Sequence, residues 1–180
     1  MKDKLNLSIP NILTLSNAFC GTMAILLLFS DINDRFTIAV ILILLGGIFD
    51  LFDGKIARKL NMKSSLGEQL DSLSDLITFG VAPVALYANS GLINIGLPSY
   101  IVLSGYVLSG VYRLARHNVL KDEKGFKGCP ITVSGVVLSL MFLVITNSRI
   151  YIEDYTFYVL NLFMLLAIFM VSRVKIKRFI

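Results

Sequence analysis

Four aspartates lie where a hydrophobic sequence is not expected to carry charge. Asp50 and Asp53 are three residues apart in one apolar stretch, and Asp71 and Asp75 are four residues apart in the next. On a helix, these spacings place both members of each pair on one face. An ionisable side chain inside a membrane span costs about 3 kcal/mol, so carboxylates in such stretches indicate a functional site.

The two stretches are joined near residue 62, which predicts an antiparallel helical hairpin. Residues equidistant from the turn then lie at equal depth, so Asp50 faces Asp75 and Asp53 faces Asp71, about 5 to 12 Å below the helix ends. Four carboxylates in one small volume need cations to offset their charge. Oxygen ligands without His or Cys favour Mg²⁺, Mn²⁺ or Ca²⁺, and two such ions suit phosphoryl transfer.

The neighbouring residues leave room for a phosphorylated ligand. Gly54 and Gly67 carry no side chain, Ala57 keeps the helix face shallow, and Arg58 supplies a cation suited to phosphate. The alternative is that the aspartates are structural, as interhelical salt bridges or as protonated acids in a polar core. The basic residues near the turn point toward the loop and reach Asp50 poorly, so we favour the metal site.

The elements that must position these residues are membrane spans. The chain has 180 residues, of which 56% are hydrophobic and 16% charged, and its mean hydropathy of +0.76 exceeds that of soluble domains. A span needs about 20 mostly apolar residues. Six segments qualify, approximately 11–30, 36–60, 66–89, 98–118, 130–147 and 155–172. We therefore predict a single all-α membrane domain over 1–180, with 1–9 as a short interfacial segment and the first span retained rather than cleaved.

The distribution of basic residues predicts the orientation. Of the 17 Lys and Arg residues, only Arg35 and Arg149 fall on one side of the predicted spans. Basic residues are retained in cytoplasmic loops, so both termini and the aspartates are expected at the cytoplasmic face of the cell membrane. The net charge of +5 is then a topology and lipid-surface signal rather than a sign of nucleic-acid binding.

The aspartates belong to a longer pattern that resembles the signature of the CDP-alcohol phosphotransferase family. It runs Asp50-Leu-Phe-Asp53-Gly54-Lys-Ile-Ala57-Arg58, eight residues, Gly67, three residues, Asp71, three residues, Asp75. The resemblance implies a six-helix protein, commonly a homodimer, in which an alcohol displaces CMP from a CDP-linked lipid. It assigns two divalent metals to Asp50, Asp53, Asp71 and Asp75, with Asp75 also the general base. It further assigns CDP binding to Asp50, Asp53, Gly54, Ala57, Arg58, Gly67 and Asp71.

Three further strings resemble the phosphatidylserine synthase branch of that family. They are Pro10-Asn11-Ile12-Leu13-Thr14, Arg113-Leu114-Ala115-Arg116-His117-Asn118 and Phe126-Lys127-Gly128-Cys129-Pro130. This branch implies L-serine as the acceptor and CDP-diacylglycerol, or CDP-archaeol in an archaeal membrane, as the donor. His117 departs from the aromatic residue expected at its position.

The residues of these strings also have simpler interpretations. Arg113 and Arg116 share a helix face and suit an anionic headgroup or the serine carboxylate, with Asn118 beside them, but positive-inside anchoring explains them equally well. Asn11 is a candidate nucleotide contact, although a helix cap is the more common role.

Other functions remain open at this level. Glycerol phosphate or inositol phosphate could replace serine as the acceptor, although each would need more cations in its pocket. A cation-coupled transporter also places carboxylates inside a bundle, but its site is expected near the midplane with repeated halves. A non-catalytic assembly protein would not need the complete set of aspartates and glycines.

Overall fold

The protein is described by a computed structural model over residues 9–60, 64–91, 96–119, 128–147 and 152–172. The predicted interfacial segment before Ile9 and most of the basic loop and terminal residues lie outside these ranges. The helices are α1 (Ile9–Leu27), α2 (Arg35–Lys59), α3 (Ser65–Asp75), the π-helix η1 (Leu76–Val81), α4 (Ala82–Asn89), α5 (Leu97–Val119), α6 (Ile131–Asn147) and α7 (Ile152–Val171).

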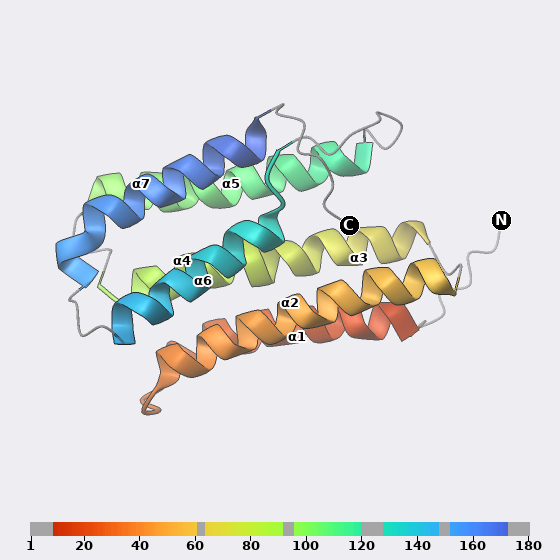
Figure 1. The fold of residues 1–180 in the computed structure, drawn as a ribbon, viewed down its shortest axis with the longest axis horizontal. Helices are drawn as coiled ribbons and strands as arrows, with labels where there is room; N and C mark the ends of the chain where they lie inside the picture. Colours follow the sequence, from red (N-terminus) through yellow and green to blue (C-terminus); the bar gives the residue numbers. More distant parts are fainter. Residues whose placement is uncertain (1–8, 61–63, 92–95, 120–127, 148–151, 173–180) are drawn as a thin grey trace.

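These elements form six rods, because α3, η1 and α4 follow one another without a break over Ser65–Asn89. Each rod begins and ends within three residues of a segment predicted from hydropathy. The rods alternate in direction, and α1 begins at the same end of the bundle at which α2 ends and α3 begins (Figure 1). The all-helical architecture with six helices is therefore confirmed.

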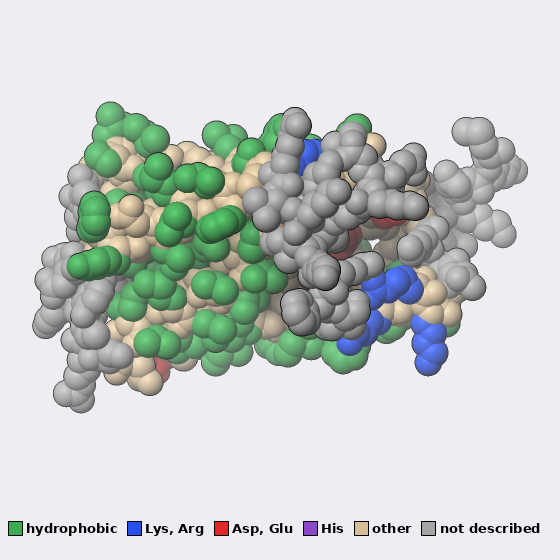
Figure 2. Space-filling model, turned by 45° about the horizontal axis from the view of Figure 1, so that its top comes forward, with side chains coloured by type: hydrophobic (Ala, Val, Ile, Leu, Met, Phe, Trp, Pro, Cys, Tyr) green, Lys and Arg blue, Asp and Glu red, His purple; other side chains and the backbone are tan. Residues whose placement is uncertain are grey.

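Long apolar helices make this an integral membrane protein. Among the described residues, α1, α2 and the rod Ser65–Asn89 are long and apolar enough to cross a membrane, and α6 and α7 contribute shorter apolar helices. Helix α5 belongs to neither group, because Ser, Gly and Tyr lower its hydropathy. Figure 2 shows apolar side chains over the middle of the molecule and Lys and Arg side chains gathered toward one end.

The helices pack in three layers, with α1 and α2 in one, α3, α4 and α6 in the middle, and α5 and α7 in the third (Figure 1). An aromatic cluster joins the middle and third layers. Tyr87 meets Phe142 and Phe163 edge to face, each with ring centroids 5.2 Å apart, and Tyr106 meets Phe163 at 5.1 Å. Edge-to-face pairs of this kind stabilise a core beyond their burial.

The π-helix directly after Asp75 is held from both sides. Thr78 donates a hydrogen bond to the backbone oxygen of Asn17 at 3.0 Å, and a Cβ at Gly21 would collide with Thr78. From α5, the Tyr106 hydroxyl donates to the backbone oxygen of Phe79 at 2.9 Å. A π-helix is often found at a functional site, and here it fixes the rod that carries Asp75 against α1.

Candidate active site

The carboxylates of α2 and α3 converge near one end of the bundle. Asp50, Asp53 and Asp71 each offer an oxygen atom, and these three atoms lie within 4.8 Å of one another. Asp53 is 4% exposed. Asp75 is 7% exposed and lies one turn deeper along the rod than Asp71. Asp75 is not part of that group, which among the described residues consists of Asp50, Asp53 and Asp71 alone.

Helix α1 contributes a polar face that the aspartate pattern does not include. The Thr14 hydroxyl lies 2.6 Å from Asp53 Oδ2 and donates to it, while the Asn17 amide donates to Asp75 Oδ1 at 3.4 Å. Asn11, Thr14 and Asn17 are all buried. Their spacing of three residues in an apolar helix was the available signal, since it places them on one face.

Helix α6 supplies a second hydroxyl that sequence reasoning missed. Thr132 Oγ1 lies 3.3 Å from Asp50 Oδ2 and 3.4 Å from Asp75 Oδ2, so one side chain connects a carboxylate of α2 with one of the middle layer. Thr132 is the second residue of α6. Two residues before that helix begins, Cys129 donates its backbone N–H to Phe169 of α7, which anchors the approach to the site.

The residues assigned to CDP surround the outer part of the carboxylate group. A Cβ at Gly54 would meet no atom of the described residues within 4 Å, so among them this part of α2 borders open space. A Cβ at Gly67 would lie 3.1 Å from Asn11 Oδ1, which places the Asn11 amide beside the start of α3. Because α1 already includes Ile9, Asn11 lies inside the first turn and does not cap it. Ala57 is half-buried, and Arg58 is exposed in the last turn of α2.

Ser64 caps the helix that carries Asp71 and Asp75. Its hydroxyl accepts a hydrogen bond from the Gly67 N–H at 3.0 Å. A serine cap satisfies one of the free N–H groups at a helix start and contributes about 1 kcal/mol. It thereby fixes the start of the helix.

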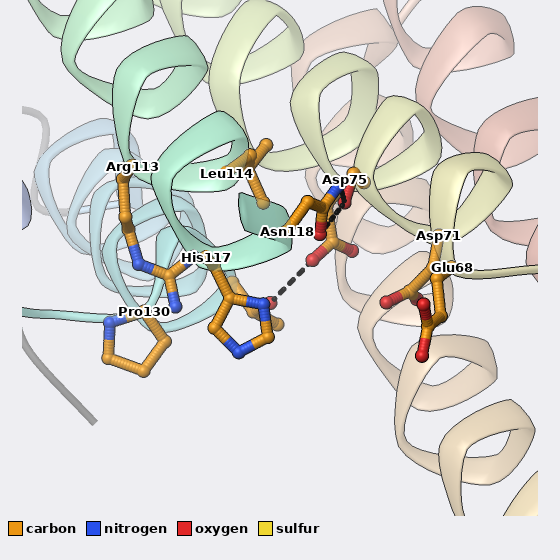
Figure 3. Close-up of a pocket in the computed structure, with 10 residues that line it drawn as sticks. Glu68, Asp71, Asp75, Arg113, Leu114, His117, Asn118 and Pro130 are labelled. Atoms are coloured by element: carbon orange, nitrogen blue, oxygen red, sulfur yellow. Dashed lines mark hydrogen bonds between the residues drawn. The ribbon is translucent and has the colours of Figure 1, made fainter. Parts of the chain in front are cut away.

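A cavity of about 290 Å³ opens beside Asp71 and Asp75, between α3 and α5. Its lining residues are Glu68, Asp71, Ser72, Asp75, Arg113, Leu114, His117, Asn118, Pro130 and Thr132. In Figure 3, the Arg113 and His117 side chains lie on one side and those of Glu68 and Asp71 on the other. The cavity therefore has a basic wall and an acidic wall.

The three predicted acceptor residues lie in different places. Arg113 is 6% exposed and lines the cavity, as does Asn118. Asn118 also connects α5 to α3, donating to Ser72 Oγ at 3.1 Å. Arg116 is not among the lining residues: it donates to the backbone oxygen of Val171 at 2.9 Å, and its guanidinium lies 5.6 Å from the Tyr112 ring centroid. The bond to Val171 connects the end of α5 to the end of α7.

The carboxylate group fits hard divalent cations. Asp50, Asp53 and Asp71 supply only oxygen donors, which Mg²⁺, Mn²⁺ and Ca²⁺ prefer. The Thr14 hydroxyl on Asp53 and the Thr132 hydroxyl on Asp50 are neighbours of the kind that orient metal-binding carboxylates. Buried carboxylates need positive charge nearby to offset their own. Bound cations would supply that charge without a basic side chain in the group.

A helical membrane bundle with this carboxylate group matches a known family. The model of the CDP-alcohol phosphatidyltransferase family matches residues 7–173, nearly the whole chain, and the protein belongs to that family. This confirms the class of protein predicted from the aspartate pattern and weighs against a transporter.

Individual relatives place it within the family. The chain is 37% identical over 135 residues to the CDP-diacylglycerol–serine O-phosphatidyltransferase of Bacillus subtilis, covering 74% of each chain. It is 39% identical over 140 residues to the archaetidylserine synthase of Methanothermobacter thermautotrophicus, covering 76% of this chain and 58% of that one. It is 36% identical over 175 residues to the CDP-diacylglycerol–serine O-phosphatidyltransferase of Methanocaldococcus jannaschii, covering 96% of this chain and 75% of the relative.

Proposed function

We propose that this protein transfers the phosphatidyl-type group of a CDP-linked lipid, CDP-diacylglycerol or CDP-archaeol, to L-serine. The products are a phosphatidylserine-type lipid and CMP. The observation that carries the proposal is the meeting of two features at Asp71, which belongs to both. On one side is an oxygen-only carboxylate group suited to a metal-bound diphosphate, and on the other is a cavity with a buried arginine. The names of the relatives agree with this assignment.

In this reaction, the serine hydroxyl oxygen forms a bond to the phosphorus that carries the lipid, and the bond from that phosphorus to the CMP oxygen breaks. The hydroxyl proton passes to Asp75 as the general base. Asp75 suits this role because it lines the cavity. Asn17 and Thr132, each 3.4 Å away, hold its two oxygens in place. A positioned base of this kind contributes about 10²–10⁴-fold to a rate.

The remaining roles follow from position. Arg113 would hold the serine carboxylate, because a guanidinium pairs with a carboxylate through two parallel hydrogen bonds. Asn118 would line the same pocket. Gly54, Ala57, Arg58 and Gly67 would accept CDP, with Asn11 beside them. Arg116 would keep α5 and α7 together and act on the acceptor only indirectly.

Asp50, Asp53, Asp71 and Asp75 would hold two divalent cations, Mg²⁺ or Mn²⁺, with Ca²⁺ a third candidate. When bound, the cations would neutralise the diphosphate and the charge that develops on the departing CMP. The side chains of α1 and α6 fix the orientation of these carboxylates in advance.

We further propose six spans with both termini and the active site at the cytoplasmic face, and a homodimer. The orientation is supported by the basic residues on one side of the spans. A thiol introduced at exposed Asp31, in a chain lacking native cysteines, should react with an impermeant reagent outside intact cells. A thiol at Lys59 should react only after lysis. Of the small residues on α5, Gly105 remains open for a helix contact between protomers, whereas Gly110 packs on Ile131.

An acceptor panel tests the proposed reaction. The purified protein should release CMP from a CDP-linked lipid with L-serine and a divalent cation, and the lipid product should carry serine. Glycerol phosphate and inositol phosphate should give no release above the rate without an acceptor. Release with glycerol phosphate but not with serine would overturn the assignment while leaving the family unchanged.

A further inference from the structure

The cavity beside the carboxylate group has walls of opposite charge. Helix α3 contributes Glu68, Asp71 and Asp75, and α5 contributes Arg113 and His117. Figure 3 shows the α3 carboxylates facing the α5 side chains across the space between them. A molecule with a single charge would be attracted by one wall and repelled by the other. A zwitterion satisfies both walls.

Glu68 is the acid of this wall that the metal site does not include. The group of metal-suited carboxylates among the described residues consists of Asp50, Asp53 and Asp71. Glu68 lies in the first turn of α3, nearly one turn before Asp71, which corresponds to about 4.5 Å along the axis. It is half-buried and lines the cavity. Its carboxylate is therefore placed toward the outer end of the pocket.

We propose that Glu68 is a selectivity residue that binds the ammonium group of the amino-acid acceptor. This inference rests on the proposed function, which places the acceptor hydroxyl at Asp75 and its carboxylate at Arg113. The ammonium and carboxylate groups of serine are bonded to the same carbon atom, so both lie within the pocket. The ammonium group therefore needs an anionic partner of its own there. Glu68 supplies that partner without competing for a metal position.

Contacts to three different substituents of one carbon atom also distinguish the two enantiomers of the acceptor. The hydroxymethyl group points to Asp75, the carboxylate to Arg113 and the ammonium group to Glu68. In D-serine two of these groups exchange places. An exchange that involves the carboxylate places it against the acidic wall, and an exchange of the ammonium and hydroxymethyl groups moves the hydroxyl away from Asp75. A pocket that binds L-serine through these three contacts therefore disfavours D-serine, and it excludes phosphorylated alcohols, whose added negative charge meets Glu68.

The test measures CMP release by wild type, E68Q and E68D with L-serine, D-serine and 3-hydroxypropionate, which is serine without its ammonium group. In E68Q, the KM for L-serine should rise about 10- to 100-fold, the effect of losing one charge-assisted hydrogen bond. The KM for 3-hydroxypropionate should stay the same or fall, and the preference for L-serine over D-serine should shrink. E68D, which keeps the charge on a shorter side chain, should be intermediate, and D31N at the other end of the bundle should match wild type.

Two results would overturn the role of Glu68. One is an equal rise in KM for serine and for 3-hydroxypropionate. The other is an unchanged serine KM with a higher Mg²⁺ requirement, which would assign Glu68 to the metals. Failure of the proposed function itself looks different, because the wild-type protein would then release no CMP with L-serine. Matching size-exclusion profiles for E68Q and E68D exclude misfolding as the cause of a change.

Discussion

The Thr132 hydroxyl lies 3.4 Å from Asp75 Oδ2, across the contact between α6 and the rod of α3. The same oxygen lies 3.3 Å from Asp50. A hydroxyl has one proton to donate, so Thr132 serves either carboxylate in turn. It thereby keeps Asp75, the proposed general base, and Asp50, a proposed metal ligand, at a fixed separation.

Replacement of Thr132 by valine should lower kcat about 10- to 100-fold, the usual cost of losing a partner that orients a site carboxylate. T132S should retain most of the activity because it keeps the hydroxyl. The control is T146V in the same helix, where the hydroxyl bonds to the backbone oxygen of Phe142 and to no other described residue. CMP release measures the rates. Equal activity of T132V and T146V would remove Thr132 from the mechanism.

Loss of the aspartates should stop turnover without unfolding the bundle. D75A removes the proposed base and D71A removes a carboxylate of the proposed metal site, so each should lose at least about 100-fold in kcat. Circular dichroism and size-exclusion chromatography should match those of wild type. Wild-type turnover in either variant would contradict the mechanism.

Metal binding should be visible in stability as well as in activity. Cations that bind only the folded protein raise its unfolding temperature, so Mg²⁺ should raise it in wild type after chelation. D71N should unfold at a higher temperature than wild type without metal, because one of three close like charges is removed. It should also gain less from Mg²⁺. An identical Mg²⁺ response in both proteins would argue against Asp71 as a ligand.

Thr14 should matter through Asp53. T14V leaves that buried carboxylate without its 2.6 Å donor, so the Mg²⁺ concentration for half-maximal activity should rise about tenfold or more. T22V is the matched control, because Thr22 is on the same helix, is exposed, and within the described part of the chain bonds only to the backbone oxygen of Ala18. If T14V and T22V need the same Mg²⁺ concentration for half-maximal activity, Thr14 does not act through Asp53.

Close packing of α6 on η1 should make Gly135 intolerant of a side chain. An added Cβ would lie 2.6 Å from Phe79 Cβ and 2.7 Å from Phe79 Cα, the second a backbone atom that cannot move alone. G135A should therefore lose about 1 to 3 kcal/mol of stability, measured as a lower unfolding temperature in detergent. G105A should have little effect, since its Cβ would meet no atom of the residues that the structure describes within 4 Å.

Hydropathy and aspartate spacing predicted much of this molecule because both depend on local rules. The length of each apolar stretch predicts where a helical rod begins and ends. Helix periodicity places Asp50, Asp53 and Asp71 on facing surfaces. The partners from other helices were not predictable in this way. Thr132 reaches Asp50 from 82 residues away, and only tertiary packing brings it there. Glu68 was also passed over, since an acid in a first helical turn is ordinary.

The π-helix at Leu76–Val81 has a consequence for the phase of the rod. A π turn contains more residues than an α turn, so it offsets the residues before it from those after it by up to about 100° around the axis, the rotation of one residue. Asp71 and Asp75 can thus face the carboxylates of α2 while Tyr87, further along, faces the aromatic core. Deleting one residue between 76 and 81 would restore the regular α-helical hydrogen-bond pattern. It would also rotate the surface that carries Asp71 and Asp75 relative to the surface that carries Tyr87. Catalytic alignment and core packing could then no longer be satisfied by the same helix.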